Sequence, residues 1–178
     1  MTMQAVPVTA YGRRFRSTTE ARWATFLTEL RIAWEYEPET FDLGPLGWYM
    51  PDFWIPEAKL FLEVKHSGEL ELAAIEKVRA LARVTDRRVA IAHGFGMPTT
   101  YDWPVPGFDR DDPGWIEAYG PQGRVSGQSF TLCICRAFGL EFDYLTHLNG
   151  CSEDRGRPLR AQLLDAYEAG ASFRADSR

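Results

Sequence analysis

A hairpin in the first half of the chain is the feature that most narrows the folds open to it. Two runs of apolar and aromatic residues, Trp48 to Ile55 and Lys59 to Lys65, flank the turn-forming residues 56–59. Runs of this kind on both sides of a short turn are typical of antiparallel strands. Pairing Ile55 with Leu60 across the turn sets the register of the whole hairpin, because antiparallel partners step in opposite directions along the chain.

The predicted register gathers charged residues on one face of the hairpin. Asp52 lies directly opposite Glu63, and Lys65 shares the face of Glu63 because side chains alternate with period two. Like charges directly opposite each other in a sheet are destabilising, and Lys65 supplies one positive charge against two negative charges. A divalent cation such as Mg²⁺ or Mn²⁺ would balance the remaining negative charge, since Mg²⁺ binds carboxylates together with water and phosphate oxygens.

Helical and strand patterns around the hairpin indicate an α/β domain. Apolar residues at helical spacing predict one helix over 17–31 and another over 69–83. The runs 34–41 and 88–93 predict further strands. The predicted order is αβββαβ.

The distribution of glycine, proline and charge divides the chain of 178 residues. We expect a basic arm at 1–16, the core at 17–94, a Gly- and Pro-rich loop at 95–127 and a small C-terminal α+β appendage at 128–178. Within the appendage, a strand over 129–135 and a helix over 159–173 are too little to bury a core of their own. We therefore expect the appendage to pack on the core.

Composition limits the compartment and the partners. The net charge of −5 argues against non-specific coating of nucleic acid, because that binding comes from cations on phosphates. Three cysteines are an odd number and favour a reducing compartment over a disulfide framework. No apolar run approaches the roughly 20 residues of a membrane span. We expect a cytoplasmic protein with no membrane partner.

The hairpin residues also carry a resemblance. Pro51-Asp52, ten intervening residues and Glu63-Val64-Lys65 resemble the PD-(D/E)XK signature of the restriction-endonuclease-like nuclease superfamily. The flanking sequences Arg16-Ser17-x-x-Glu20 and Pro51-Asp52-Phe53-Trp54-Ile55-Pro56 are similar to those of phage junction-resolving endonuclease I and of transposon-end-cleaving nucleases. The resemblance covers residues 12–94.

This resemblance implies a restriction-endonuclease-like αβββαβ core, with a mixed central sheet flanked by helices, and a metal-dependent DNA endonuclease. Asp52 and Glu63 would hold one or two Mg²⁺ or Mn²⁺ ions, Glu20 would be a third or outer ligand, and Lys65 would orient the attacking water. It further implies duplex or branched DNA as the substrate and a homodimer, since a symmetric pair of sites cuts two strands. A catalytically idle DNA-binding or scaffolding module and an RNA nuclease remain as alternatives.

The carboxylates of the signature also have simpler interpretations. Ser17-Thr18-Thr19-Glu20 is a helix capping box as well, in which the Glu20 side chain accepts from the backbone amide of Ser17. Asp52 and Glu63 can instead be solvated carboxylates paired to Lys65 and an arginine. Glu35, Glu37 and Glu39 alternate along the strand predicted over 34–41, and we expect them to form its solvated face.

Two further groups of residues are candidates for binding. Arginine binds phosphate oxygens bidentately, so phosphate contact is one interpretation of the basic cluster and a solvated charged face is the other. The cluster consists of Arg13, Arg14, Arg16 and Arg22. A zinc site is the second candidate, but its cysteine pair has one intervening residue where a zinc knuckle has two, so we expect buried apolar cysteines instead. The four residues are Cys133, Cys135, His147 and Cys151.

Overall fold

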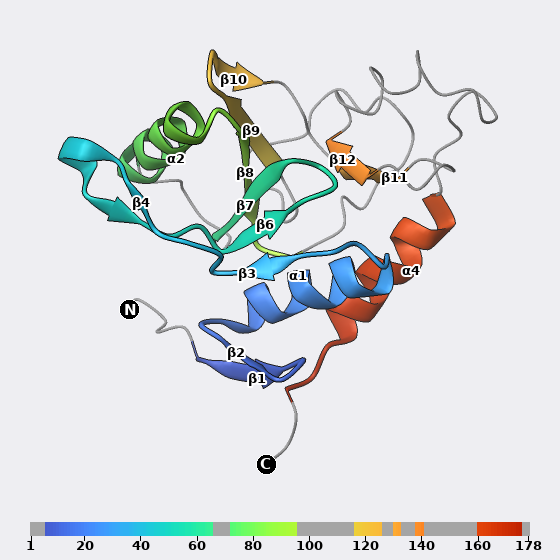
Figure 1. The fold of residues 1–178 in the computed structure, drawn as a ribbon. Coiled ribbons are helices and arrows are strands. Elements are labelled where there is room, and N and C mark those ends of the chain that lie inside the picture. Colours follow the sequence, from blue (N-terminus) through green and yellow to red (C-terminus); the bar gives the residue numbers. More distant parts are fainter. Residues whose placement is uncertain are drawn as a thin grey trace.

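The chain folds as a mixed α/β structure, which confirms the predicted class (Figure 1). A computed structural model describes residues 6–65, 72–95, 116–125, 130–132, 138–140 and 160–175. The helices of these parts are α1 (Thr18–Glu29), α2 (Leu72–Thr85) and α4 (Arg160–Ser172), with a short 3-10 helix η1 (Gly44–Leu46). The strands are β1 (Val8–Ala10), β2 (Arg13–Phe15), β3 (Glu35–Tyr36), β4 (Phe41–Asp42), β5 (Trp48–Tyr49), β6 (Phe53–Ile55), β7 (Leu60–Lys65), β8 (Arg88–His93), β9 (Ile116–Gly120), β10 (Gly123–Val125), β11 (Phe130–Leu132) and β12 (Phe138–Leu140).

The largest described sheet has six strands in the order β10-β9-β8-β7-β6-β3. Strands β7 and β8 run parallel, as expected for two strands joined by the crossover helix α2, and the other neighbours run antiparallel. In the hairpin, Phe53 pairs with Leu62 and Ile55 pairs with Leu60. The register predicted from the sequence is therefore confirmed.

The two faces of the sheet are covered by different helices. Leu60, Leu62 and Val64 of β7 belong to the same buried cluster as Trp23, Phe26 and Leu27 of α1. Phe61, between them, belongs to a second cluster with Ile75, Val78 and Leu81 of α2. Side chains that alternate along β7 thus enter two cores, and the sheet lies between α1 and α2 (Figure 1).

The helix α1 begins and ends where its local sequence dictates. Ser17 is its N-cap, and the Ser17 side chain accepts from the backbone amide of Glu20. The expected end at Arg31 is two residues too late, because Arg31 has a φ of 58° and lies outside the helical region. The amide of Ile32 then donates to the carbonyl of Leu27, which closes the helix end.

The strand expected over 34–41 is wrong beyond its first residues. Only β3 joins the sheet, and Glu37 has a φ of 48° that turns the chain away. Pro38 follows, and proline has no amide to donate to a neighbouring strand. The chain then forms a separate two-stranded sheet from β4 and β5, joined through η1. The strand expected over 48–55 is correspondingly divided into β5 and β6.

The segment expected to be an N-terminal arm contains a hairpin. Strands β1 and β2 pair with each other, and Phe15 at the end of β2 is fully buried. Its ring centroid lies 4.6 Å from that of Tyr36. The hairpin is therefore part of the core packing, and it fixes the chain immediately before α1.

The interval expected to be a loop contributes two strands. Strands β9 and β10 extend the large sheet beyond β8, and Tyr119 of β9 is buried against the α2 side. Glycine and proline in this interval therefore do not mark the edge of the sheet. None of the described helices is long and apolar enough to cross a membrane.

The helix α4 packs against α1 on the outer side of the structure (Figure 1). The ring centroid of Tyr167 lies 4.3 Å from that of Phe26 and 6.1 Å from that of Trp23. At Gly170 a Cβ atom would lie 2.9 Å from the carbonyl oxygen of Arg22 and would clash with the ring of Phe95. Glycine at this position permits the close approach of the two helices.

Candidate active site

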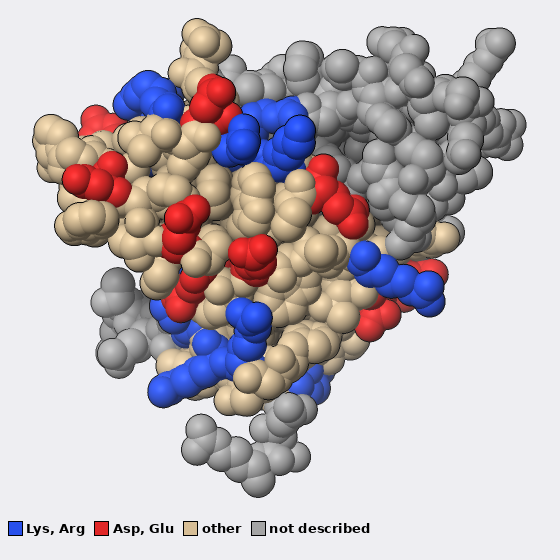
Figure 2. Space-filling model, viewed as in Figure 1, with Lys and Arg blue, Asp and Glu red and all other residues tan. Residues whose placement is uncertain are grey.

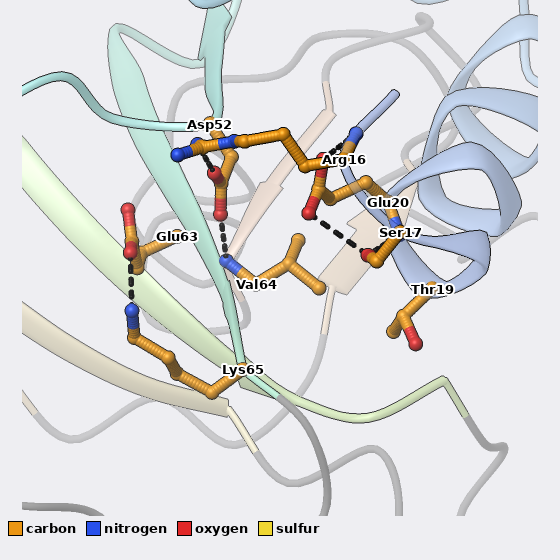
Figure 3. A pocket seen from close by; sticks show the side chains of 8 residues that line it. All are labelled: Arg16, Ser17, Thr19, Glu20, Asp52, Glu63, Val64 and Lys65. Atoms are coloured by element: carbon orange, nitrogen blue, oxygen red, sulfur yellow. Dashed lines mark hydrogen bonds and ion pairs between the residues drawn. The ribbon is translucent and has the colours of Figure 1, made fainter. Parts of the chain in front are cut away.

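A polar pocket of about 250 Å³ lies where the start of α1 meets β6 and β7 (Figure 3). Its lining contains all four candidate catalytic residues from the sequence and one of the four candidate arginines. The lining residues are Arg16, Ser17, Thr19, Glu20, Asp52, Glu63, Val64 and Lys65. The hairpin and the N-terminus of α1, which lie far apart in the sequence, therefore build one site.

Asp52 is held at the start of β6 and is only 3% exposed. One carboxylate oxygen, Oδ2, accepts from the backbone amide of Val64 at 2.7 Å. The other, Oδ1, accepts from the Arg16 guanidinium at 2.5 Å. Burial and, next, the charge of Glu63 raise the pKa of Asp52 well above its usual range, although the Val64 amide and Arg16 act in the opposite direction.

Glu63 is equally buried, at 4% exposed, and its two oxygens differ. Oε1 accepts from Lys65 Nζ at 2.6 Å. Oε2 is buried and has no hydrogen-bond partner among the residues that the structure describes. A buried carboxylate oxygen without a partner is costly, and it is the kind of atom that a cation or an ordered water satisfies.

These two carboxylates fit a hard divalent cation. They supply oxygen donors only, they lie just before β6 and on β7, and one of their oxygens has no partner among the described residues. Mg²⁺ is commonly bound by one or two carboxylates, with water and substrate oxygens completing its coordination. The residues present are therefore suitable to hold Mg²⁺ or Mn²⁺.

Glu20 is engaged by the start of its own helix. Its Oε1 accepts from Ser17 Oγ at 2.8 Å, and its Oε2 accepts from the Arg16 amide at 3.0 Å and from the Tyr36 hydroxyl at 2.6 Å. The Ser17 side chain accepts from the Glu20 amide as a capping box predicts, but the Glu20 carboxylate accepts from the Arg16 amide, one residue before the Ser17 amide that the box would use. Among the described residues no group of three His, Cys, Asp or Glu side chains has the arrangement of a metal site.

Side-chain alternation explains why Glu20 stands apart from Glu63. Val64 points toward α1, so Glu63 and Lys65 point to the other face of β7 (Figure 3). Glu20 approaches from the α1 side and lies next to Asp52, whose pKa its charge helps to raise. Asp52 stands between the two glutamates, and a third-ligand role for Glu20 requires its present hydrogen bonds to change.

Arg16 spans the top of the pocket (Figure 3). Its guanidinium pairs with Asp52 through Nη2 and with Glu37 through Nε, the latter at 2.9 Å. The side chain is 54% exposed although its anchor on Asp52 is buried. Of the four candidate arginines, this one is placed to combine contact with a carboxylate and access to solvent.

The other arginines lie outside the pocket lining. Arg13 and Arg14 are exposed on β2, and the Arg13 guanidinium stacks over the Trp34 ring at 5.8 Å. Arg22 is half-buried on α1, and its Nε has no partner within the described parts of the chain. Figure 2 shows basic side chains over the β1–β2 hairpin, with acidic side chains above them. The surface near the pocket is therefore of mixed charge.

Three residues lie around the pocket although the sequence did not predict them there. Glu37 is not on a solvated strand face, because its amide donates to the Asp52 carbonyl at 2.8 Å and its side chain binds Arg16. Tyr36 donates to Glu20. Burial, followed by the charge of Glu63, raises the pKa of the Tyr49 phenol, so this ring lies against the site. The sequence held one signal of this arrangement: Pro38 indicates that the strand ends close to Glu37.

The candidate zinc ligands Cys133, Cys135, His147 and Cys151 lie outside the described residues. No family model matches the chain, and comparison with curated proteins and with solved structures also gave no match. The chemistry of the site therefore has to be inferred from its residues.

Proposed function

We propose that this chain is a metal-dependent nuclease that hydrolyses phosphodiester bonds in DNA, with duplex or branched DNA as its substrate. The observation that carries the proposal is the pair of buried carboxylates, Asp52 and Glu63, together with a Glu63 Oε2 that has no hydrogen-bond partner among the described residues. A lysine bound to the second carboxylate completes the set.

A purely structural role accounts poorly for the buried pair. Burial and the charge of Glu63 raise the pKa of Asp52, and keeping Asp52 ionised in this desolvated place reduces the stability of the folded state. Arrangements of this kind are concentrated at functional sites, where binding a cation recovers the lost stability. A divalent cation held by Asp52 and Glu63 would neutralise them more fully than Lys65 does, because Lys65 is 38% exposed.

The order of elements supports the same proposal. Helix α1 is followed by β3, β6 and β7, then by α2 and β8, and the carboxylates stand at β6 and β7. We propose that this part is a restriction-endonuclease-like αβββαβ core, to which β9 and β10 add an edge. The motif residues occupy the central hairpin of that arrangement.

The charged residues of the pocket would have distinct roles in hydrolysis. A bound Mg²⁺ or Mn²⁺ would polarise the scissile phosphate and make the attacking water more acidic. Lys65 Nζ, held by Glu63 at 2.6 Å, is placed to orient that water and to stabilise the negative charge that develops on the phosphate. Arg16 supplies a guanidinium that can contact a phosphate oxygen bidentately. Glu20 fixes the start of α1, and thereby the position of Arg16.

One observation favours a second candidate, a catalytically idle DNA-binding module. In this structure Arg16 and Lys65 together provide one positive charge for each of the two carboxylates. A site neutralised in this way has less need of a metal. Under this interpretation the protein binds DNA equally well with and without divalent cations, and it does not cut.

The deciding experiment incubates the protein with linear, nicked, single-stranded and branched DNA, in Mg²⁺, Mn²⁺ or EDTA. We expect cleavage of a duplex or branched substrate in either metal and none in EDTA. Glu63→Gln should lower the rate by about two orders of magnitude or more, since it removes a metal ligand and the partner of Lys65. Glu39→Gln is the matched control, because Glu39 is exposed and does not line the pocket. Unchanged cleavage in EDTA, or wild-type rates for folded Glu63→Gln, would refute the proposal.

A further inference from the structure

We propose that Arg16 is a displaceable counter-ion, which occupies the cation position on Asp52 in the metal-free protein and transfers to a substrate phosphate when a divalent metal binds. The inference rests on the proposed function and adds a coupling to it. Metal and polynucleotide would bind cooperatively, because each of them takes one partner of the Arg16–Asp52 pair.

The carboxylate oxygens of Asp52 and Glu63 differ in how many hydrogen-bond partners they have. Both oxygens of Asp52 are engaged, Oδ2 by the Val64 amide and Oδ1 by Arg16. Glu63 uses only one oxygen, Oε1, and leaves Oε2 without a partner among the described residues. The Val64 amide belongs to the sheet and cannot leave. A cation shared by the two carboxylates would therefore compete with Arg16 for Oδ1.

Electrostatics points the same way. The Arg16 guanidinium and a divalent cation at Asp52 would be like charges in neighbouring positions, inside a pocket where burial strengthens their repulsion. Arg16 currently supplies the positive charge that pairs with the buried Asp52 carboxylate. Once a divalent cation performs that task, nothing on Asp52 retains the guanidinium.

Arg16 is built so that its head can move while its backbone stays. Its amide donates to both Glu20 Oε2 and the Tyr36 hydroxyl, each at 3.0 Å, just before the N-cap Ser17. The side chain, in contrast, is 54% exposed and reaches across the open top of the pocket (Figure 3). A change of side-chain torsions is sufficient to free the guanidinium.

The second carboxylate on Arg16 keeps the released guanidinium close to the site. Glu37 accepts from Nε at 2.9 Å, which leaves the Nη2 donor that now binds Asp52 free to turn toward a ligand. A phosphate oxygen is the natural acceptor, because a guanidinium matches phosphate geometry with paired donors. The same residue thus serves as a metal substitute in one state and as a phosphate ligand in the other.

The coupling has to be reciprocal. If metal binding releases Arg16 for phosphate, phosphate binding must raise metal affinity by the same factor. Couplings of this kind commonly amount to about five- to 150-fold in affinity. Metal affinity measured without DNA should therefore be weaker than the carboxylates alone would give.

The test measures Mn²⁺ binding to the full chain by isothermal titration calorimetry, without DNA. Arg16→Gln should bind Mn²⁺ at least about fivefold more tightly than the wild type, because the competing charge is gone. Arg16→Lys keeps a positive charge beside Asp52 and should remain near the wild-type affinity. Arg83→Gln, a matched loss of one exposed arginine on α2, should not change it.

A second measurement compares the affinity for a short DNA duplex with and without Ca²⁺. A gel verifies that the duplex stays intact. Ca²⁺ should raise the duplex affinity of the wild type by about fivefold or more, and it should hardly change that of Arg16→Gln. Circular dichroism and thermal unfolding confirm that both variants fold.

The outcomes separate the two proposals. If the wild type binds Mn²⁺ and Arg16→Gln binds it no more tightly, Arg16 is not a displaceable counter-ion, while the nuclease proposal stands. If Ca²⁺ raises duplex affinity equally in both proteins, the same conclusion follows. If neither protein binds Mn²⁺, both proposals fail.

Discussion

Lys65 Nζ donates to Glu63 Oε1 at 2.6 Å, from a position two residues further along the same strand. The pair is possible because period-two alternation puts both side chains on the face of β7 opposite to Val64. It fixes the lysine over the site without the help of any other described side chain, and Glu63 keeps its second oxygen unbonded.

This pairing leads to a prediction for Lys65→Met. The variant should lose cleavage by about two orders of magnitude while Mn²⁺ binding is retained, because the charge that acts on the transition state is removed and both carboxylates remain. Cleavage assays and calorimetry on the same preparation measure the two effects. Lys59→Met is the control, since Lys59 is exposed in the hairpin turn. Loss of Mn²⁺ binding together with cleavage would show that Lys65 organises the carboxylates instead.

Asp52→Asn should make the metal-free protein more stable at neutral pH. Burial and Glu63 raise the pKa of Asp52 in the folded state above its unfolded value, so ionising Asp52 costs stability as pH rises through this range. Asparagine cannot ionise and can still accept from the Val64 amide. We expect a gain of about 1 kcal/mol at pH 7 in EDTA, reduced by the loss of the half-exposed Arg16 ion pair.

Urea unfolding at pH 4 and pH 7 measures this effect. Relative to Asp52→Asn, the wild type should lose stability between the two pH values, and Mg²⁺ should restore it in the wild type alone. An Asn variant that is less stable than the wild type at pH 7 in EDTA would contradict the prediction.

Glu20→Gln distinguishes a cap from a metal ligand. Both oxygens of Glu20 are already bonded to the start of α1 and to Tyr36, so we expect Mn²⁺ affinity to stay within about threefold of the wild type. Ser17→Ala, which removes the N-cap oxygen, should instead lower the free energy of unfolding by about 1 kcal/mol. A tenfold loss of Mn²⁺ affinity in Glu20→Gln would make it a ligand.

Gly170→Ala tests the contact between α4 and α1. An added Cβ has no room beside the Arg22 carbonyl and the Phe95 ring, so the helices must separate at a cost of about 1–3 kcal/mol. Thermal and urea unfolding give the change. Ala171→Ser, at an exposed position of the same helix, should remain within about 0.5 kcal/mol of the wild type.

The hairpin and the helices around it were accessible from the sequence. Period-two alternation and the turn at 56–59 were enough to predict that Ile55 pairs with Leu60, and β8 was predicted with its observed bounds. The hairpin strands β6 and β7 and the neighbouring β8 lie inside the sheet, where the hydrophobic pattern and the structure obey the same period.

The other features of the fold and of the site depend on tertiary contacts, which a local sequence pattern does not reveal. Glu37 looked like a member of an alternating strand, but its positive φ and the following Pro38 remove it from the sheet and bring it to Arg16. Strands β9 and β10 lie among glycines and prolines, and tertiary pairing with β8 outweighs their weak local preference. The engagement of Glu20 by Tyr36 joins residues from two elements.

The amide of Val64 shows how the site is tied to the sheet. In the register of β6 and β7, the residue facing Val64 would be Pro51, which stands outside β6. The Asp52 carboxylate accepts the Val64 amide hydrogen at this end of the pairing. The carboxylate thus takes the position of a strand carbonyl. Slow hydrogen exchange of the Val64 amide is therefore a direct measure of whether Asp52 is in place.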